Sequence, residues 1–170
     1  MPTTRVQDYR YIDERFDHIV SLGMFEHVGA KNYREYFEIA ARCLNEDGLF
    51  LLHTIGKNFK DIVPDPWIHK YIFFNGALPS LSSMSEALEN LFIVEDLHNF
   101  GAYYDQTLLA WFDNFEASWK HLQDNYDQRF YRMWKYYLLA CAGAFRAQSL
   151  QLWQIVLSKQ GVSGVYQRVS

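Results

Sequence analysis

The sequence lacks the cluster of closely spaced glycines that a cofactor-binding α/β chain usually has after its first strand. The 170 residues include nine glycines, and no two of them are separated by a single residue. Gly161 and Gly164 come closest, but they follow the last predicted strand. A nucleotide-like cofactor is usually held by a glycine-rich turn between a first strand and a first helix. We therefore expect the first half of a doubly wound fold, with that turn, to be absent.

Cysteine is also rare, and histidine is never clustered. Cys43 and Cys141 lie in apolar, helix-like stretches without CxxC spacing, which predicts free buried thiols of a cytosolic protein. The six histidines show neither HxxxH nor HxH spacing, so we predict no metal site.

Long apolar runs and an excess of basic residues are both missing. No run approaches the ~20 apolar residues of a membrane span, and residues 1–10 lack the apolar segment of a signal peptide. We therefore expect any contact with lipid to be made from the surface. The net charge of −4 argues against a nucleic-acid partner. A hydrophobic content of 49% in 170 residues indicates one globular domain.

The first half of the chain has the pattern of a βαβ unit. Residues 15–23 form an apolar run that predicts a buried strand, and 49–56 form a second one. Between them, 31–48 carries apolar side chains at three- and four-residue spacing, which predicts an amphipathic helix. This order predicts two parallel neighbouring strands joined by a right-handed crossover.

The later pattern is mixed. Ser82 or Ser83 is expected to cap a short helix, with Glu86 in its first turn. The expected elements are an irregular segment with a short helix at 57–80, a helix at 83–90, a strand at 92–101, helices at 106–126 and 127–148, a strand at 150–160, and a tail at 161–170. Residues 1–5 are expected to be disordered or a non-native start.

A titratable side chain follows or ends each of the first two predicted strands. Glu26 lies in "GMFEHVG" and His53 in "LFLLHTIG". Because parallel strands place their carboxyl ends at one edge of the sheet, we expect both side chains to converge on one pocket. The alternatives are a helix-capping carboxylate at Glu26 and a histidine bonded to a nearby carbonyl at His53.

Six segments of the chain, from about residue 6 to 160, resemble one family in order. They are "FDHIVSLGMFEHVGAKNY", "GLFLLHTIG", "DPWIHKYIF", "HNFGAYYDQTLLAW", "YYLLACAGAFRA" and "LQLWQIVLSK". Together they resemble the C-terminal portion of cyclopropane-fatty-acyl-phospholipid synthases and, more loosely, mycolic-acid cyclopropane synthases. The resemblance implies an α/β fold, the C-terminal half of a Rossmann-like class I methyltransferase lacking the glycine-rich first strand-turn-helix. It further implies methylene transfer from S-adenosylmethionine to a cis double bond of a phospholipid acyl chain.

The resemblance also implies a site for bicarbonate, which would act as the base. The matching positions are Glu26, His53, the backbone of Ile55, and Tyr104, with His27 as a neighbour that orients Glu26 or faces the helix at 31–48. The family adds a cysteine from its N-terminal half, which neither Cys43 nor Cys141 matches. "QDYR" falls where such enzymes contact adenine, so Asp8 and Tyr9 are candidate cofactor contacts, unless they belong to a disordered start.

Aromatic and basic clusters are further candidates. "YIFF" (71–74), "AYYD" (102–105) and "AWF" (110–112) fit an acyl channel or ordinary core packing. Arg129, Arg132 and Lys135 form a basic patch that meets phospholipid head groups or is simply solvated.

The expected setting is cytoplasmic, peripheral to the inner membrane face, with phospholipid acyl chains as partners. Two copies are expected to pair through the exposed sheet edge. The alternatives to a catalytic half are a non-catalytic truncated remnant and one subunit of a split enzyme. In each case we expect the isolated chain to be inactive.

Overall fold

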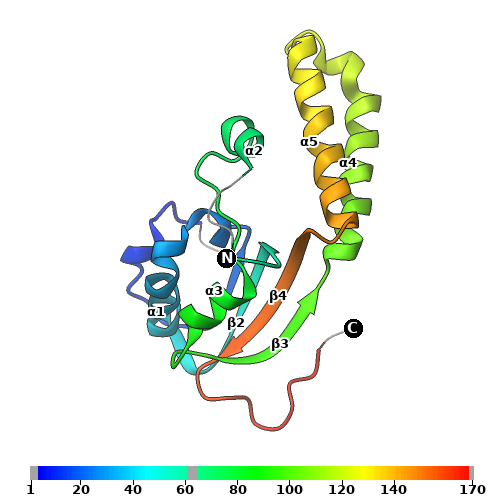
Figure 1. Cartoon of the computed structure of the whole chain (residues 1–170). Helices are drawn as coiled ribbons and strands as arrows, with labels where there is room; N and C mark the ends of the chain where they lie inside the picture. Colours follow the sequence, from blue (N-terminus) through cyan, green and yellow to red (C-terminus); the bar gives the residue numbers. More distant parts are fainter. Residues whose placement is uncertain (1–3, 61–64, 169–170) are drawn as a thin grey trace.

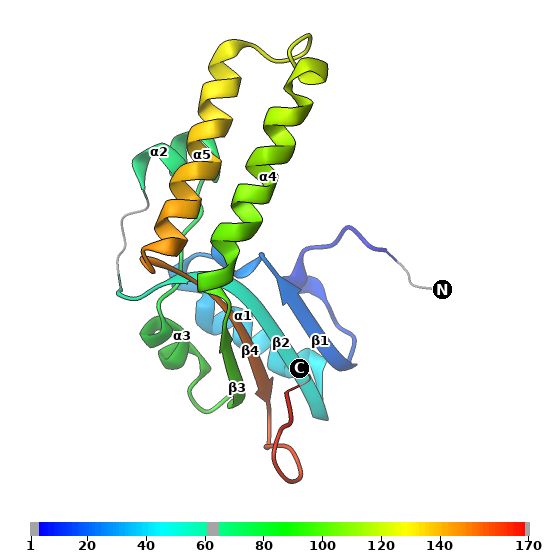
Figure 2. The same ribbon diagram turned by 90° about the vertical axis from the view of Figure 1, so that its right-hand side faces the viewer.

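The fold is a mixed α/β arrangement, as predicted. The computed structural model describes residues 4–60 and 65–168. In these ranges, helices pack on one face of a four-stranded sheet, and a long helical hairpin projects beyond one end of it (Figures 1 and 2). The predicted disordered start and C-terminal tail stay predictions, and residues 1–3 and 169–170 lie outside the described residues.

The sheet has the strand order β1-β2-β4-β3. β1 (Phe16–Leu22) runs parallel to β2 (Leu44–Lys57), which confirms the predicted pairing of parallel neighbours. β4 (Leu150–Ser158) is antiparallel to both β2 and β3 (Ile93–Asn99). In the described sheet, β1 is therefore an edge strand with one neighbour.

The crossover from β1 to β2 contains α1 (Tyr33–Cys43), preceded by two short 3₁₀ turns, η2 (Phe25–His27) and η3 (Ala30–Asn32). The predicted helix over 31–48, with Leu44 in its apolar stripe and a stop at Asn45–Gly48, ends too late, because β2 begins at Leu44. Leu44 pairs with Phe16 and is fully buried. An apolar residue at position 44 fits the apolar face of the helix and also the buried face of the strand. The spacing of apolar residues therefore could not show where the helix ends and the strand begins.

The main core lies between α1, α3 (Leu81–Leu88) and one face of the sheet. Alternate residues of β2, Phe50 and Leu52, point into it, and Trp153 and Ile155 of β4 lie beside them. Alternation along a strand sends neighbouring side chains to opposite faces. Leu51, His53 and Ile55 therefore lie on the other face of the sheet.

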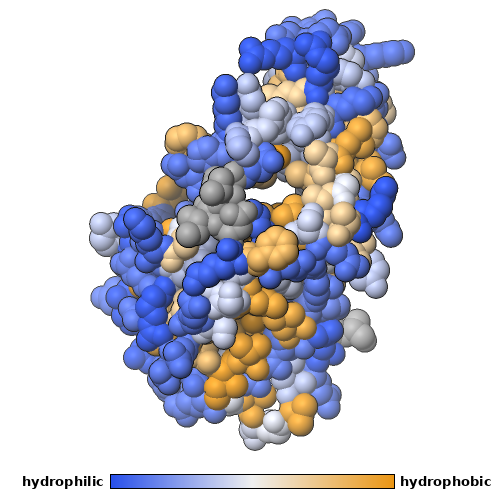
Figure 3. Space-filling view, viewed as in Figure 1, coloured by the Kyte–Doolittle hydropathy of each residue, from blue (hydrophilic) through white to orange (hydrophobic). Residues whose placement is uncertain are grey.

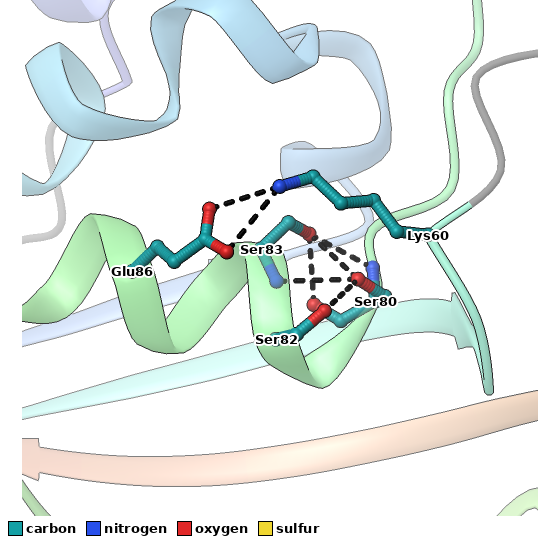
Figure 4. A network of polar contacts seen from close by, with 5 residues as sticks. All are labelled: Lys60, Ser80, Ser82, Ser83 and Glu86. Carbon is teal, nitrogen blue, oxygen red and sulfur yellow. Dashed lines mark hydrogen bonds and ion pairs between the residues drawn. The ribbon is translucent and has the colours of Figure 1, made fainter.

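α3 begins with a reciprocal cap (Figure 4). Ser80 is its N-cap: the Ser80 hydroxyl accepts from the Ser83 N–H at 3.2 Å, while the Ser83 hydroxyl accepts from the Ser80 N–H at 3.0 Å. The predicted cap at Ser82 or Ser83 is therefore wrong, and Glu86 lies beyond the first turn, where it pairs with Lys60 at 3.0 Å. With several serines in succession, composition could not choose among them.

The hairpin consists of α4 (Gly101–Leu122) and α5 (Gln128–Arg146) and encloses a second, mostly aromatic core. α4 begins five residues before the predicted 106. The Asn99 carboxamide oxygen accepts from the Gly101 N–H at 2.9 Å, and a Cβ at Gly101 would lie 3.0 Å from the Gln151 side chain. Gly101 thus lies close to β4 at the start of α4. The spacing of apolar residues in the sequence did not predict this start.

Two surface features complete the fold. α2 (Pro66–Tyr71) is the short helix expected in the 57–80 segment and lies beside α5. An apolar patch lies between α3 and β3 (Figure 3). It forms an open cavity of about 550 Å³ whose apolar lining is Leu81, Met84, Leu88, Phe92, Val94, Leu97 and Ile155.

Candidate active site

Glu26 is held at the end of the two parallel strands. Gly23, with a φ of +62°, turns the chain after β1, and its N–H donates to the His53 carbonyl at 3.0 Å. The turn carries Glu26 over the end of β2, where one carboxylate oxygen, Oε1, accepts from the Ile55 N–H at 2.7 Å. Two of the predicted site positions are thus bonded to each other directly.

The second oxygen of the same carboxylate is unpartnered. Glu26 is only 8% exposed, and no hydrogen bond to its Oε2 is formed by any described residue. A buried polar atom without a partner costs roughly 1–3 kcal/mol, and native proteins rarely leave one unexplained. A carboxylate oxygen can only accept, so the group that fits here must carry a hydrogen to donate.

His53 lies on the opposite side of the sheet from α1. It pairs across the sheet with Gln154 of β4, and the Gln154 Nε2 lies 3.2 Å from the His53 Nδ1. With the amide nitrogen as donor, Nδ1 accepts and Nε2 carries the ring proton. Sequence reasoning missed Gln154, although a polar residue inside the apolar run "LQLWQIVLS" was a usable signal.

Tyr104 lies in the first turn of α4, at the base of the hairpin. Its half-buried ring packs edge-on against Phe145, with ring centroids 5.0 Å apart. Burial, and then the negative charge of Glu26, raise the pKa of the Tyr104 phenol above its usual value. Tyr104 is thus within electrostatic reach of Glu26 and remains protonated at neutral pH. Both Ile55 and Tyr104 pack on the second core.

The remaining predicted positions, His27, Asp8 and Tyr9, make contacts with other residues. His27 is exposed and its ring faces Phe73, with 6.0 Å between centroids. Asp8 is the N-cap of η1 (Tyr9–Tyr11) and is paired with Arg10 at 2.6 Å, which holds its pKa at about 2. Tyr9 packs edge-on against Tyr36, 5.6 Å away.

The cysteines are free thiols, as predicted, but only part of the aromatic runs is packed in a core. Cys43 is buried and Cys141 is half-buried, and burial raises the pKa of the Cys141 thiol to about 11. Several rings of the aromatic runs are exposed instead of being packed in a core, namely Tyr71, Phe73, Phe74, Tyr103 and Trp111. These rings are available for contact with another molecule.

The chain matches the family model described as mycolic acid cyclopropane synthetase over residues 2–155. The chain belongs to this family. It is 55% identical over 163 residues to the cyclopropane-fatty-acyl-phospholipid synthase of Escherichia coli K12, covering 96% of this chain and 43% of that protein. A probable fatty acid methyltransferase of Pseudomonas putida is 33% identical, and the match covers 94% of this chain and 43% of that relative. The chain thus spans less than half the length of both relatives.

Solved structures confirm the fold class. The cyclopropane synthase MmaA2 from Mycobacterium tuberculosis superposes with a TM-score of 0.82 at 25% identity, covering 89% of this chain and 58% of that one. The mycolic acid cyclopropane synthase CmaA1, complexed with SAH and CTAB, gives a TM-score of 0.81 at 30% identity over the same shares. The described residues therefore have the fold of part of a class I methyltransferase, as predicted.

Two further observations bear on the kind of site. None of the described helices is both long enough and apolar enough to cross a membrane. Within residues 4–60 and 65–168, no group of three or more histidine, cysteine, aspartate or glutamate side chains is placed to hold a metal ion.

Proposed function

We propose that this chain provides the anion-binding and acyl-binding part of a cyclopropane-fatty-acyl-phospholipid synthase. Such an enzyme transfers a methylene group from S-adenosylmethionine to a cis double bond of a phospholipid acyl chain. The observation that carries the proposal is the buried, unpartnered Oε2 of Glu26 beside the Ile55 N–H.

The ligand proposed for this oxygen is bicarbonate. A bound anion that meets a carboxylate must donate a hydrogen to it, which bicarbonate can do and chloride or carbonate cannot. Glu26 accepts that hydrogen, and the protonated phenol of Tyr104 donates to another oxygen of the anion. His53, oriented through Gln154, presents its Nε2–H as a second donor.

The proposed chemistry needs a base and a dry pocket. When bound, S-adenosylmethionine would supply an electrophilic methyl group to the alkene and would leave as S-adenosylhomocysteine. A bicarbonate held by Glu26, Tyr104 and His53 would supply the base that accepts one proton from the added methyl group, so that the released electron pair closes the ring. The residues of this chain hold the base and exclude water that would trap the cation.

Of the two candidate contacts for adenine, Asp8 and Tyr9, the second fits its role better. Both Asp8 oxygens accept from Arg10, so the Asp8 carboxylate reaches an adenine amine only by sharing these bonds. The half-buried ring of Tyr9, fixed against Tyr36, is the better candidate for stacking on adenine.

The proposed substrate places the protein on the cytoplasmic side of the inner membrane as a peripheral protein. The exposed rings of Tyr71, Phe73 and Phe74 support contact with acyl chains. Aromatic side chains with one polar end favour the boundary between lipid and water.

A chimera tests the proposal. The 163-residue stretch of this chain that matches the Escherichia coli synthase at 55% identity replaces the corresponding region of that protein. We expect the chimera to convert unsaturated phospholipid to cyclopropane product, and the Glu26→Gln chimera to lose activity by about 100-fold or more. A folded Glu26→Gln chimera with full activity would overturn the assignment of this carboxylate. Titration with ¹³C-bicarbonate, followed by NMR line broadening, gives a second readout that does not depend on turnover.

A further inference from the structure

A small pocket lies between α2 and α5, away from Glu26 and His53. Its volume is about 250 Å³. This is below the roughly 300–1,000 Å³ of sites that enclose a drug-sized ligand, so the pocket fits a small polar group better than an acyl chain. Its lining consists of Trp67, Tyr71, Arg129, Arg132, Met133 and Tyr136.

The spacing of the α5 residues explains why they share this pocket. Arg129, Arg132, Met133 and Tyr136 follow at three-, four- and seven-residue offsets and so occupy one stripe of the helix. α2 docks on this stripe through Trp67, whose ring lies edge-on to Tyr136 with centroids 4.5 Å apart. The pocket therefore has aromatic walls and two guanidinium groups.

The three basic residues expected to form one patch lie on different sides of α5. Lys135 lies toward α4, where its Nζ is 3.5 Å from the Glu116 carboxylate. Arg129 and Arg132 line the α2 pocket instead, and neither forms an ion pair with any residue in the described ranges. Within the described residues, no carboxylate therefore neutralises either guanidinium group.

Lys70 adds a third positive charge at the rim. Its Nζ lies 5.1 Å from the centre of the Tyr71 ring. Lys70, and then Arg129, lower the pKa of the Tyr71 phenol, which reflects the positive field at this point. The acidic residues at the starts of the two helices are engaged elsewhere: Asp65 accepts from the N–H groups of α2, and Asp127 accepts from that of Phe130.

We infer that this pocket binds the phosphate group of a phospholipid head group at a membrane surface, through Arg129 and Arg132. Planar guanidinium groups match the paired oxygens of a phosphate. The inference rests on the proposed function, because it places the head group of the proposed phospholipid substrate.

One observation favours a bilayer over a soluble phosphate. Exposed apolar rings, including Phe73 and Phe74, follow directly after α2, and the Phe74 ring packs against His69 of that helix. Cations with aromatic side chains beside them match the boundary between head groups and acyl chains.

The test measures binding to vesicles of phosphatidylglycerol and phosphatidylcholine at fixed ionic strength. We expect the Arg129→Gln/Arg132→Gln variant to bind roughly 20- to 30-fold more weakly, given the usual contribution of each basic residue near an anionic surface. The matched control is Arg15→Gln/Lys31→Gln, which removes the same charge outside the pocket and is expected to bind within about twofold of the parent chain. Circular dichroism checks that each variant is folded.

A second readout locates the contact. Quenching by brominated lipid is measured for the parent chain and for Trp67→Phe, and the difference reports on Trp67 alone. We expect the parent to lose more fluorescence than the variant. Inorganic phosphate should release the chain from vesicles more effectively than sodium chloride of equal ionic strength.

Several outcomes would overturn the inference. These are an equal loss of binding in both double variants, unchanged binding in Arg129→Gln/Arg132→Gln, or no quenching of Trp67. Saturable binding of inorganic phosphate without binding to vesicles would assign the pocket to a soluble anion. Failure of the parent chain to bind vesicles while bicarbonate still binds at Glu26 would overturn this inference and leave the proposed function standing.

Discussion

The Glu26 carboxylate accepts from the Ile55 backbone N–H at 2.7 Å, across the ends of two neighbouring parallel strands. The family resemblance implies that both groups bind one anion, yet here they also bind each other. The bond directs Oε1 at the strand end and leaves Oε2 facing the position of the proposed ligand. A carboxylate fixed in this way needs little reorganisation when the anion arrives.

Removing the Glu26 side chain should destabilise the protein. In Glu26→Ala the partly buried Ile55 N–H loses its acceptor, so we expect the free energy of unfolding to fall by roughly 1–3 kcal/mol. In Glu26→Gln the amide oxygen still accepts from Ile55, and the loss should be smaller. Urea denaturation of the three proteins measures the difference. Equal stability of all three would show that the Ile55 bond contributes nothing.

The contact between Gln154 and His53 should control which ring nitrogen carries the proton. We expect ¹⁵N-edited NMR of the parent chain to show His53 as the Nε2–H tautomer, because Nδ1 accepts from the Gln154 amide. Gln154→Leu should give a mixture of tautomers, whereas Gln106→Leu, at an exposed position on α4, should leave the His53 signals unchanged. An Nδ1–H tautomer in the parent would mean that the amide is turned the other way.

Buried phenols should make the protein less stable at high pH. Burial raises the pKa of Tyr36 to about 12, so the folded state holds its proton after the unfolded chain has lost it. The stabilisation is complete below pH 10 and is lost as the pH rises through about 12. We expect Tyr36→Phe to reduce the decline in unfolding free energy between pH 9 and 11.5, measured with urea, by on the order of 1–2 kcal/mol. Tyr126→Phe, at an exposed position, should not change it.

The β1 edge should promote self-association. Val20 and Leu22 are 60% and 65% exposed, and in the described sheet β1 pairs only with β2. Such an edge presents unpaired backbone groups to another chain. We expect sedimentation of residues 1–170 to show dimers that Val20→Lys/Leu22→Lys disrupts. The control Val94→Lys changes the opposite edge strand. A monomer at high concentration would contradict the prediction.

Residues 1–170 by themselves should not form cyclopropane product. The sequence contains no glycine-rich turn to bring backbone close to the methyl donor, and losing a positioning element costs orders of magnitude in rate. The assay supplies S-adenosylmethionine, bicarbonate and unsaturated phospholipid vesicles, followed by analysis of the fatty esters. Product above the Glu26→Gln background would show that this part alone is sufficient.

Sequence reasoning predicted the elements well and their boundaries less well. The parallel pairing of β1 with β2 followed from the spacing of two apolar runs. Parallel neighbours need a crossover connection of about a dozen residues or more, usually a helix, and the segment between the runs is long enough for one. The starts of β2 and α4 did not follow, since they depend on contacts between distant residues, such as Leu44 with Phe16 and Gly101 with Gln151. The capping role of Ser80 was hidden among neighbouring serines.

The candidate site shows the same limit. Glu26 and His53 could be chosen from their positions at strand ends. The backbone of Ile55 was added by the family resemblance, whereas the residue that orients His53, Gln154, depends on sheet register. Register is a property of the pairing and not of either strand alone, so one sequence could not determine it.

The projecting hairpin has the geometry of a lever, with Tyr104 close to its base. α4 is 22 residues long, or about 33 Å at the usual rise per residue. A tilt of about 10° would move its tip by ~6 Å but the backbone at Tyr104 by under ~1 Å. The pivot is held by the Asp105–Arg146 pair at 3.0 Å, which joins the start of α4 to the end of α5. A tilt of this size would therefore leave the Tyr104 phenol nearly in place beside Glu26 while the far end of the hairpin moves.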